Sequence, residues 1–466
     1  MEKTPWSRSD WPKNGPGGDE MKERWIEIAP GTDEKQEQWF TNWIAGERIP
    51  FQDAEAKERY KERAGMIRDA VQMKKPPKRV PVSPSTGYFP LEYSGVTYYD
   101  MMYNQEELIR AWRKFCDDFE PDTFRGAPGM AGMVFELLDF QLYRWPGHGL
   151  PEDREFQFVE KEYMTSAEYQ DLIDDPTGWF LTAYFPRIFG SLKSLNRLPV
   201  FPNINEIQMV IPAVIPFARP ELKEALQSLM AAGEAAVQWG QGIRKFNAEI
   251  MGRGYPGMGG GFVKAPFDVI GDTLRGTMGV MMDMFRHPDE LKEACERLTP
   301  IMVKAGIAAA RGTGAHFITI PLHKGADGFM SEEQFLTFYW PTLRKVLIGL
   351  MDQGLVPIPF AEGSYNTRLE IISDLPQGKC IWYFDKTDMA RAKETIGQIA
   401  CLQGNVPLDL MAAGTPDEVK SYIKKLIEVA GKDGGFILST GAGLQGAKVE
   451  NVKAFIDAGK EYGVYS

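Results

Sequence analysis

Four positions with reactive side chains stand at the ends of short apolar segments in the C-terminal half of the chain. Glu362, Asp385 and Cys401 each come at a predicted strand end, and His323 closes the segment His316–His323. If neighbouring strands run parallel, their ends lie side by side, so we predict that these four side chains converge. Carboxylate, thiolate and imidazole groups suit zinc, which makes Glu362, Cys401 and His323 candidate metal ligands. Glu362 and Asp385 are also candidate catalytic acids or bases.

Each of these positions has an ordinary structural interpretation as well. Cys401 could be a small buried apolar side chain, and His323 a loop histidine without a special task. Asp385 precedes Lys386 and could form an internal salt bridge with it, while Glu362 could cap the helix that follows it. The spacing of the four positions is irregular and matches no short metal-binding signature. Both interpretations therefore stay open.

The segment that positions Glu362 has the pattern of a buried strand. Leu355–Ala361 is a short apolar run that follows Gly354 and ends just before Glu362 and Gly363. Similar apolar segments, each followed by a helical pattern, precede and follow it. This alternation predicts an α/β protein with a TIM-like (β/α)8 barrel, in which functional side chains lie at the C-terminal ends of the strands.

The pattern along the chain predicts two regions, an N-terminal arm and helical extension over residues 1–75 and the barrel over residues 76–466. The first region starts polar and rich in Gly and Pro, and continues with amphipathic helical spacing that Pro76 and Pro77 end. Within the second region, residues 146–178 are polar and loop-like. We interpret them as an insertion over the barrel mouth that could act as a lid.

Composition narrows the classes of function. The chain has 466 residues, 43% hydrophobic and 25% charged, as in ordinary globular proteins. Its net charge of -11 argues against a nucleic-acid partner. Its four cysteines lack CxxC spacing and are typical of reduced thiols. The N-terminus has no apolar signal core and no apolar run is long enough to span a bilayer, so we expect a soluble, cytoplasmic protein without a membrane partner.

Motifs for several common reactions are missing. The sequence contains no GxSxG nucleophile elbow, no HExxH zinc motif and no D-x-H-x-x-G pattern of a bound-corrinoid module. Residues 252–257 fit GxGxxG formally, but they follow a helical pattern instead of a strand. We therefore discount them as a dinucleotide site.

The C-terminal half resembles the uroporphyrinogen decarboxylase superfamily. The likeness extends over roughly residues 76–466, and it implies a TIM-like barrel. It rests on four short motifs in the family's order, supported by two further segments. The four motifs are weak singly and specific together, and they are Leu402–Pro407, Ala413–Val419, Gly434–Gly441 and Glu450–Ala454; the two further segments are Gly261–Phe267 and Phe335–Pro341.

The superfamily has two main chemistries, and the residues here depart from both patterns. The decarboxylases carry the segment R-Q-A-G-R-Y-L-P-E-Y-R, whereas the matching Pro84–Tyr93 lacks both leading arginines. A substrate with many carboxylates needs cations, so this loss argues against porphyrinogen decarboxylation. The zinc methyltransferases carry H-x-C-G and a later G-C-G. The matching positions here are Phe360, Glu362 and Ala442, which replace all three usual zinc ligands.

The resemblance implies a corrinoid-dependent methyltransferase. Such an enzyme moves a methyl group from a small methylated substrate, for example a methyl ether, to a corrinoid (cobalamin) on a partner carrier protein. Ether cleavage needs a protonated or metal-bound leaving oxygen. Glu362 or Asp385 could be the acid, with a pKa raised by a dry site, and zinc is the candidate metal for the same task. Homodimers are common in this family.

Four residues are candidate substrate contacts. Tyr88 and Tyr93 lie in an aromatic-rich segment that suits a flat substrate or the corrinoid face, although it could equally be packing. Gln403 and Asn405 belong to the first shared motif. Two other hypotheses remain, a decarboxylase of a different carboxylated substrate and a non-catalytic binding member of the family.

Overall fold

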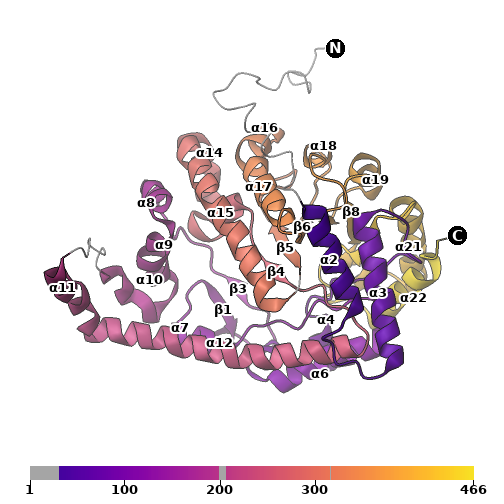
Figure 1. Cartoon of the computed structure of the whole chain (residues 1–466), viewed down its shortest axis with the longest axis horizontal. Coiled ribbons are helices and arrows are strands. Elements are labelled where there is room, and N and C mark those ends of the chain that lie inside the picture. Colours follow the sequence, from indigo (N-terminus) through magenta and orange to yellow (C-terminus); the bar gives the residue numbers. More distant parts are fainter. Residues whose placement is uncertain (1–30, 199–205, 315, 466) are drawn as a thin grey trace, which may run out of the picture.

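The computed structural model describes residues 31–198, 206–314 and 316–465. Its centre is a parallel sheet of six strands whose order in the sheet is their order in the chain (Figure 1). Parallel neighbours need crossover connections, and helices alternate with these strands as the sequence predicts. The strands are β4 (Gly261–Phe262), β5 (Phe317–Leu322), β6 (Val356–Ala361), β7 (Ile381–Phe384), β8 (Cys401–Val406) and β9 (Phe436–Thr440).

Helices cover this sheet and extend away from it. In Figure 1, α12 runs along one side of the molecule with α11 near its far end. The α-helices are α2 (Thr32–Ala45), α3 (Ala54–Gln72), α4 (Phe89–Ser94), α5 (Tyr98–Tyr103), α6 (Gln105–Phe119), α7 (Gly132–Leu138), α8 (Tyr169–Asp174), α9 (Pro176–Trp179), α10 (Phe185–Ile188), α11 (Val210–Val214), α12 (Pro220–Gly252), α13 (Pro266–Asp268), α14 (Gly276–Arg286), α15 (Pro288–Thr313), α16 (Glu332–Gln334), α17 (Trp340–Met351), α18 (Leu369–Ile372), α19 (Met389–Ile396), α20 (Leu408–Ala413), α21 (Pro416–Ala430) and α22 (Val449–Tyr462).

The central sheet buries both of its faces. Successive residues of a strand point to opposite sides, so each strand supplies two sets of side chains. The outer set packs in the main core with residues of the covering helices, and it includes Ile318, Ile320, Leu322, Trp382, Leu402 and Leu438. The inner set packs in a second cluster, and it includes Phe317, Val356, Ile358, Ile381, Tyr383, Cys401 and Ile437. We call these two surfaces the outer face and the inner face.

Two N-terminal helices close the lower part of the inner face. Trp39 and Phe40 of α2 and Ile67 and Val71 of α3 pack in the same cluster as the inner strand residues. Burial of each such side chain stabilises the fold by about 1.5–3 kcal/mol. The helical patterning predicted within residues 34–75 is present in α2 and α3, whereas the domain boundary at residue 75 stays a prediction. We call this packed layer the apolar floor.

A closed barrel of eight strands is not present among the residues that the structure describes, which corrects part of the sequence prediction. Single bridges extend the sheet at its two edges: Val82 pairs with Leu438 of β9, and Phe124 pairs with Gly257 just before β4. The Asp122 N–H donates to the Val82 carbonyl at 2.9 Å and links the two extensions. The α/β class and the parallel sheet are confirmed.

Proline explains why the pairing at the first extension is so short. The segment Val80–Pro84 contains Pro81 and Pro84, which have no N–H to donate to a strand ladder. Only the Ser83 N–H and the Pro81 carbonyl exchange hydrogen bonds with Leu438, both at 2.9 Å. A strand that cannot continue its ladder is reduced to a bridge.

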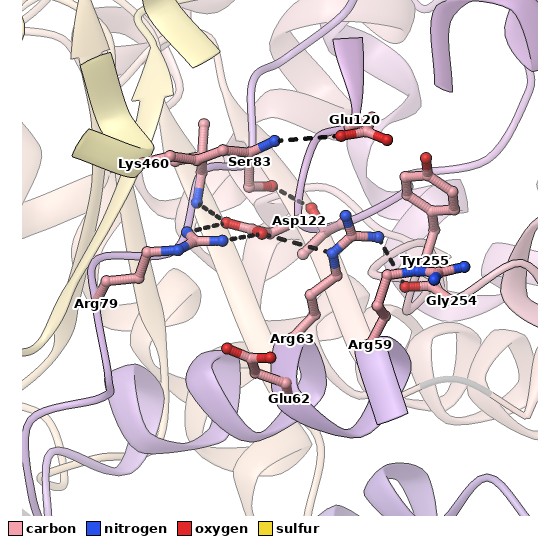
Figure 2. Close-up of polar contacts among 12 residues, drawn as sticks. Arg59, Glu62, Arg63, Arg79, Ser83, Glu120, Asp122, Gly254, Tyr255 and Lys460 are labelled. Carbon is pink, nitrogen blue, oxygen red and sulfur yellow. Dashed lines mark hydrogen bonds and ion pairs between the residues drawn. The ribbon is translucent and has the colours of Figure 1, made fainter. Parts of the chain in front are cut away.

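A buried carboxylate ties these extensions to α3 (Figure 2). Asp122 is fully buried, and its two oxygens accept hydrogen bonds from Arg79 at 2.5 and 2.6 Å and from the Val82 N–H at 2.7 Å. Arg63 of α3 lies 3.6 Å away. Beside this cluster is a cavity of about 260 Å³, lined by Gln52, Arg59, Arg63, Asp117, Glu120, Arg253 and Tyr255. Removal of the Asp122 charge would leave Arg79 without its counter-ion.

A small separate sheet overlaps the start of the predicted insertion, because its middle strand begins three residues before residue 146. Its strands are β1 (Tyr143–Pro146), β2 (Gly149–Leu150) and β3 (Gln157–Phe158), with β1 in the middle. The Tyr163 and Met164 N–H groups donate to the Leu274 carbonyl, at the end of the π-helical turn η6 (Val269–Leu274). The insertion thus contacts the segment that follows β4, while its role as a lid stays a prediction.

Within residues 31–198, 206–314 and 316–465, no helix is both long and apolar enough to pass through a membrane.

Candidate active site

Three titratable side chains line up at the C-terminal ends of β5 and β6. His323 directly follows β5 and Glu362 directly follows β6, as the sequence predicts. The Nδ1 of His323 lies 2.6 Å from Oδ2 of Asp272, and its Nε2 lies 3.6 Å from Oε1 of Glu362. Asp272 belongs to η6, after β4. An imidazole between two carboxylates can move a proton between them.

The three groups differ in their contact with solvent. The side chain of Asp272 is 10% exposed, that of His323 33% and that of Glu362 43%. Glu362 is therefore the member that a molecule approaching the strand ends meets first. Asp272 is the inner anchor of the row.

His323 and Lys264 keep Asp272 ionised. Lys264 forms a short ion pair with Asp272, and the Lys324 Nζ lies 3.2 Å from it. Burial opposes ionisation, but the hydrogen bond from His323 and the charges of Lys264 and His323 outweigh it and lower the pKa of Asp272. An ionised carboxylate can only accept hydrogen bonds, so the Nδ1 of His323 carries the proton.

The surroundings raise the pKa of the other two members of the row, His323 and Glu362. Burial works against a charged imidazole, but the hydrogen bond and charge of Asp272, with the charge of Glu362, raise the pKa of His323. Burial is the largest cause that raises the pKa of Glu362, and the charges of Asp272 and Asp385 add to it against the effect of His323. A carboxyl group whose pKa is raised is suited to donate a proton near neutral pH.

A second carboxylate fixes the backbone around His323. Asp268 is fully buried and accepts hydrogen bonds from the N–H groups of His323 and Lys324, both at 3.0 Å, and from the Tyr339 hydroxyl at 2.6 Å. Burial and the neighbouring charge of Asp272 raise the pKa of Asp268. Asp268 holds the turn after β5, and so it positions the imidazole.

Asp385 supports Glu362 from the neighbouring strand. It follows β7, as the sequence predicts, and its Oδ2 accepts a hydrogen bond from the Gly363 N–H at 3.0 Å. Burial raises the pKa of Asp385. The contact fixes the turn that carries Glu362, whereas a direct catalytic role for Asp385 stays a prediction.

Cys401 does not join these residues, and the predicted convergence is wrong for it. It is the first residue of β8, at the opposite end of the sheet from the strand ends that carry His323 and Glu362. Its side chain is fully buried in the apolar floor, and burial raises the pKa of its thiol. The structural alternative for Cys401, a small buried apolar side chain, therefore describes its place.

The residues at the family's zinc positions do not fit a metal either. Phe360 stacks on Tyr383 with ring centroids 4.4 Å apart, and the Ala442 carbonyl accepts a hydrogen bond from the Thr440 hydroxyl at 2.6 Å. Throughout the described part of the chain, no three or more His, Cys, Asp or Glu side chains are arranged to hold a metal ion. The set Glu362, Cys401 and His323 is therefore not assembled as a metal centre.

Gln403 and Asn405 lie on the inner face, near the strand ends. Tyr383 of β7 is registered with Phe360 on one side and with Gln403 on the other, so the three side chains share one face. The Asn405 Nδ2 donates to the Thr387 carbonyl at 2.7 Å. Both predicted contacts are buried on the face from which Glu362 rises.

The two predicted tyrosines have different surroundings. Tyr88 packs edge-on against Tyr98 and Phe156, with ring centroids 5.4 and 6.0 Å away. Tyr93 belongs to α4 and contacts α6, where its hydroxyl donates to Asp118 at 2.7 Å and its ring contacts Phe119. Tyr93 therefore contacts helices instead of strand ends, and both substrate contacts stay predictions.

Sequence reasoning missed three contributors, Asp268, Asp272 and Arg125. The two aspartates are four residues apart in a helical segment, which puts them on one face, and this spacing could have indicated a shared task. Arg125 follows the bridge at Phe124, and its guanidinium carbon lies 5.5 Å from the Tyr383 ring centroid. Nothing in the spacing around Arg125 indicates that it reaches the inner face.

Comparisons with known proteins agree with this fold. Residues 258–462 match the family profile described as Uroporphyrinogen decarboxylase (URO-D). Among solved structures, a methyltransferase from Methanosarcina mazei superposes with a TM-score of 0.57 at 18% sequence identity, covering 87% of this chain and 98% of that chain. A search of curated proteins finds no match.

The solved structure is too distant in sequence to carry more than the fold, and the family match begins after residue 257. The extension of the resemblance back to residue 76 stays a prediction. The matched residues 258–462 hold the whole row Asp272–His323–Glu362 and the supporting Asp268, so this part of the chain is similar to the uroporphyrinogen decarboxylase family.

Proposed function

We propose that the protein is a methyltransferase that moves a methyl group from a small methylated substrate, such as a methoxylated compound, to a corrinoid on a separate carrier protein. The observation that carries this proposal is the row Asp272–His323–Glu362 at the strand ends. Demethylation of an ether leaves an oxygen that must take up a proton. The row ends in a partly exposed carboxyl group whose pKa is raised.

Glu362 is the proton donor in this proposal. When the bond between the methyl carbon and the ether oxygen breaks, the electron pair of that bond stays on the oxygen, and the Glu362 proton moves to it. The corrinoid, when its carrier is bound, supplies the nucleophile that accepts the methyl group. With its side chain 43% exposed, Glu362 can meet a substrate presented from outside the sheet.

His323 restores the proton and Asp272 keeps it oriented. After the transfer, the Glu362 carboxylate faces the Nε2 of His323 at 3.6 Å. Asp272 holds the Nδ1 proton, and Asp268 fixes the backbone N–H of the same residue. Each contact keeps the imidazole in one orientation toward Glu362. No step in this scheme uses zinc, since the residues at the family's ligand positions do not fit it.

The test is a methyl-transfer assay. The purified protein is mixed with reduced corrinoid on a carrier protein and a panel of methoxylated aromatic compounds, and the visible absorption of the methylated corrinoid is followed. We expect Glu362→Gln to lower the rate by about 10²–10⁴-fold. The matched control is Glu370→Gln, an exposed carboxyl group of α18 that pairs with Arg391; it should keep the wild-type rate. An unchanged rate in Glu362→Gln would refute the acid role.

Decarboxylation of a carboxylated substrate is the second candidate. The observation in its favour is Arg125, a cation whose buried nitrogens have no anionic partner among the described residues. Release of CO₂ from a carboxylated compound without any methylation of the corrinoid would replace the methyltransferase proposal by this one. Failure of both reactions would favour a non-catalytic binding protein.

A further inference from the structure

Two neighbouring polar groups on the inner face lack the partners that buried groups normally have. The Nε and Nη2 atoms of Arg125 are buried, and neither has a hydrogen-bond partner among the residues that the structure describes. The same holds for both amide atoms of Gln403, whose side chain is fully buried. Buried polar groups in native proteins are nearly always paired, so each exception needs an explanation.

Arg125, which is partly buried as a whole, differs in this respect from the two fully buried arginines of the described residues. Arg275 pairs with Asp283, and the Arg368 guanidinium donates to the Gly325 and Met330 carbonyls. Arg125 instead lies over the ring of Tyr383, with its guanidinium carbon 5.5 Å from the centroid. Burial lowers the pKa of Arg125, as expected for a guanidinium without an anionic partner. An uncompensated buried cation is costly, and a bound anion would offset that cost.

Gln403 is the neighbour of the same tyrosine in the sheet. Residues 383 and 403 are directly registered in adjacent parallel strands, which run about 4.8 Å apart. Their side chains therefore stand side by side on the inner face. Tyr383 offers no hydroxyl proton to Gln403, because it donates to the Thr440 carbonyl at 2.8 Å.

Tyr383 and Phe360 connect these groups to the strand end that carries Glu362. The Tyr383 ring that Arg125 covers also stacks on Phe360, at 4.4 Å between centroids. Glu362 follows Phe360 by two residues and stands just past the end of β6, where its N–H donates to the Phe360 carbonyl at 3.1 Å. The inner face thus has an apolar floor, a level with a cation and an amide, and a level with the proton donor.

We propose that Arg125 and Gln403 form a carboxylate-binding subsite, so that the substrate is a methoxylated aromatic acid held by its carboxylate with its ether oxygen toward Glu362. A guanidinium binds a carboxylate through two parallel N–H···O bonds, and the Gln403 Nε2 supplies a further donor. The inference rests on the proposed function for the ether group, whereas the carboxylate subsite depends on the inner face alone.

The test measures binding without any corrinoid, so that it does not depend on methyl transfer. Calorimetry compares 4-methoxybenzoate with its neutral analogue 4-methoxybenzamide. We expect the wild-type protein to bind the acid about 10- to 100-fold more tightly, which corresponds to the 1.5–3 kcal/mol of charged hydrogen bonds. Arg125→Met should reduce the affinity for the acid to that for the amide. Arg297→Met, at an exposed position of α15, is the matched control and should bind like wild type.

A second variant keeps the test decisive if Arg125→Met fails to fold. Gln403→Leu removes both amide atoms at similar size and should weaken binding of the acid by about 10-fold, through one lost charged hydrogen bond. Equal affinity of the wild-type protein for acid and amide, or no binding of either, would overturn the subsite. Tight binding of the acid with no methyl transfer would keep the subsite and refute the proposed function.

Discussion

The substitution Asp272→Asn tests the electrostatics of the proposed active site most directly. It keeps the shape of the side chain and removes the charge that holds the Nδ1 of His323 at 2.6 Å. Lys264 and Lys324, which both pair with Asp272 in the wild-type protein, would then stand near the imidazole without their carboxylate. We therefore expect the pKa of His323 to fall from above its ordinary value of about 6.5 to below it.

The size of the change follows from the geometry. An opposite charge within about 4–6 Å shifts a pKa by about 1–3 units. The side chain of His323 is 33% exposed, so solvent screens the pair and the lower end applies, about 1 unit or 1.4 kcal/mol. The raised pKa of His323 stabilises the wild-type fold below about pH 6.5, and this contribution is lost as the pH rises through the folded pKa. Because the pKa of Asp272 is lowered, the stabilisation by this ion pair is also lost on the acid side, as the pH falls below about 4.

Two measurements check this expectation. NMR titration of the ring C–H signals gives the pKa of His323 in both proteins, with His316, whose pKa burial lowers to about 4, as an internal control. Thermal unfolding should show a larger loss of stability for Asp272→Asn at pH 5.5 than at pH 8.5. An unchanged pKa of His323, or a loss of stability that grows above pH 7, would refute the assigned ion pair.

Two further predictions concern the fold. Asp122→Asn should lower the free energy of unfolding by about 3 kcal/mol in urea titrations, because it removes the buried counter-ion of Arg79. The control is Glu62→Gln, since Glu62 is an exposed partner of Lys78. It should change the free energy of unfolding by less than about 0.5 kcal/mol. The four cysteines are buried, and burial raises the pKa of Cys116 and Cys380 to about 12, so a disulfide reagent at pH 8 should react with none of them until the protein is unfolded. Rapid labelling of the native protein would contradict that burial.

The strand ends could be predicted because the signal for them is local. A short apolar run bounded by glycine indicates a buried strand, and the residue after it lies at the edge of a parallel sheet. The segments predicted to end at Glu362 and His323 are β6 and β5, which end one residue earlier at Ala361 and Leu322. The same logic failed at Cys401, since an apolar run alone does not tell which of its residues begins the strand.

The partners of His323 could not be predicted in the same way. Asp272 and Lys264 lie more than 50 positions before it in the chain, and their approach depends on the packing of η6 beside β5. Arg125 is more distant still, and it follows a segment that pairs with the sheet through a single bridge. Local periodicity contains no information on such contacts, which the tertiary structure alone determines.

The organisation of the inner face connects the stability of the fold to the proposed chemistry. Phe317, Val356 and Ile381 pack with α2 and α3, and this apolar floor stabilises the ends of the strands that carry no polar groups. The same strands continue toward Arg125 and Gln403, where buried groups are left without partners and destabilise the fold. Replacement of Arg125 by an apolar residue should then raise the stability of the ligand-free protein while it removes binding of the acid. Arg125 and Gln403 cost stability in a sheet that is otherwise well packed. A ligand that completes their hydrogen bonds best explains why these two residues are present.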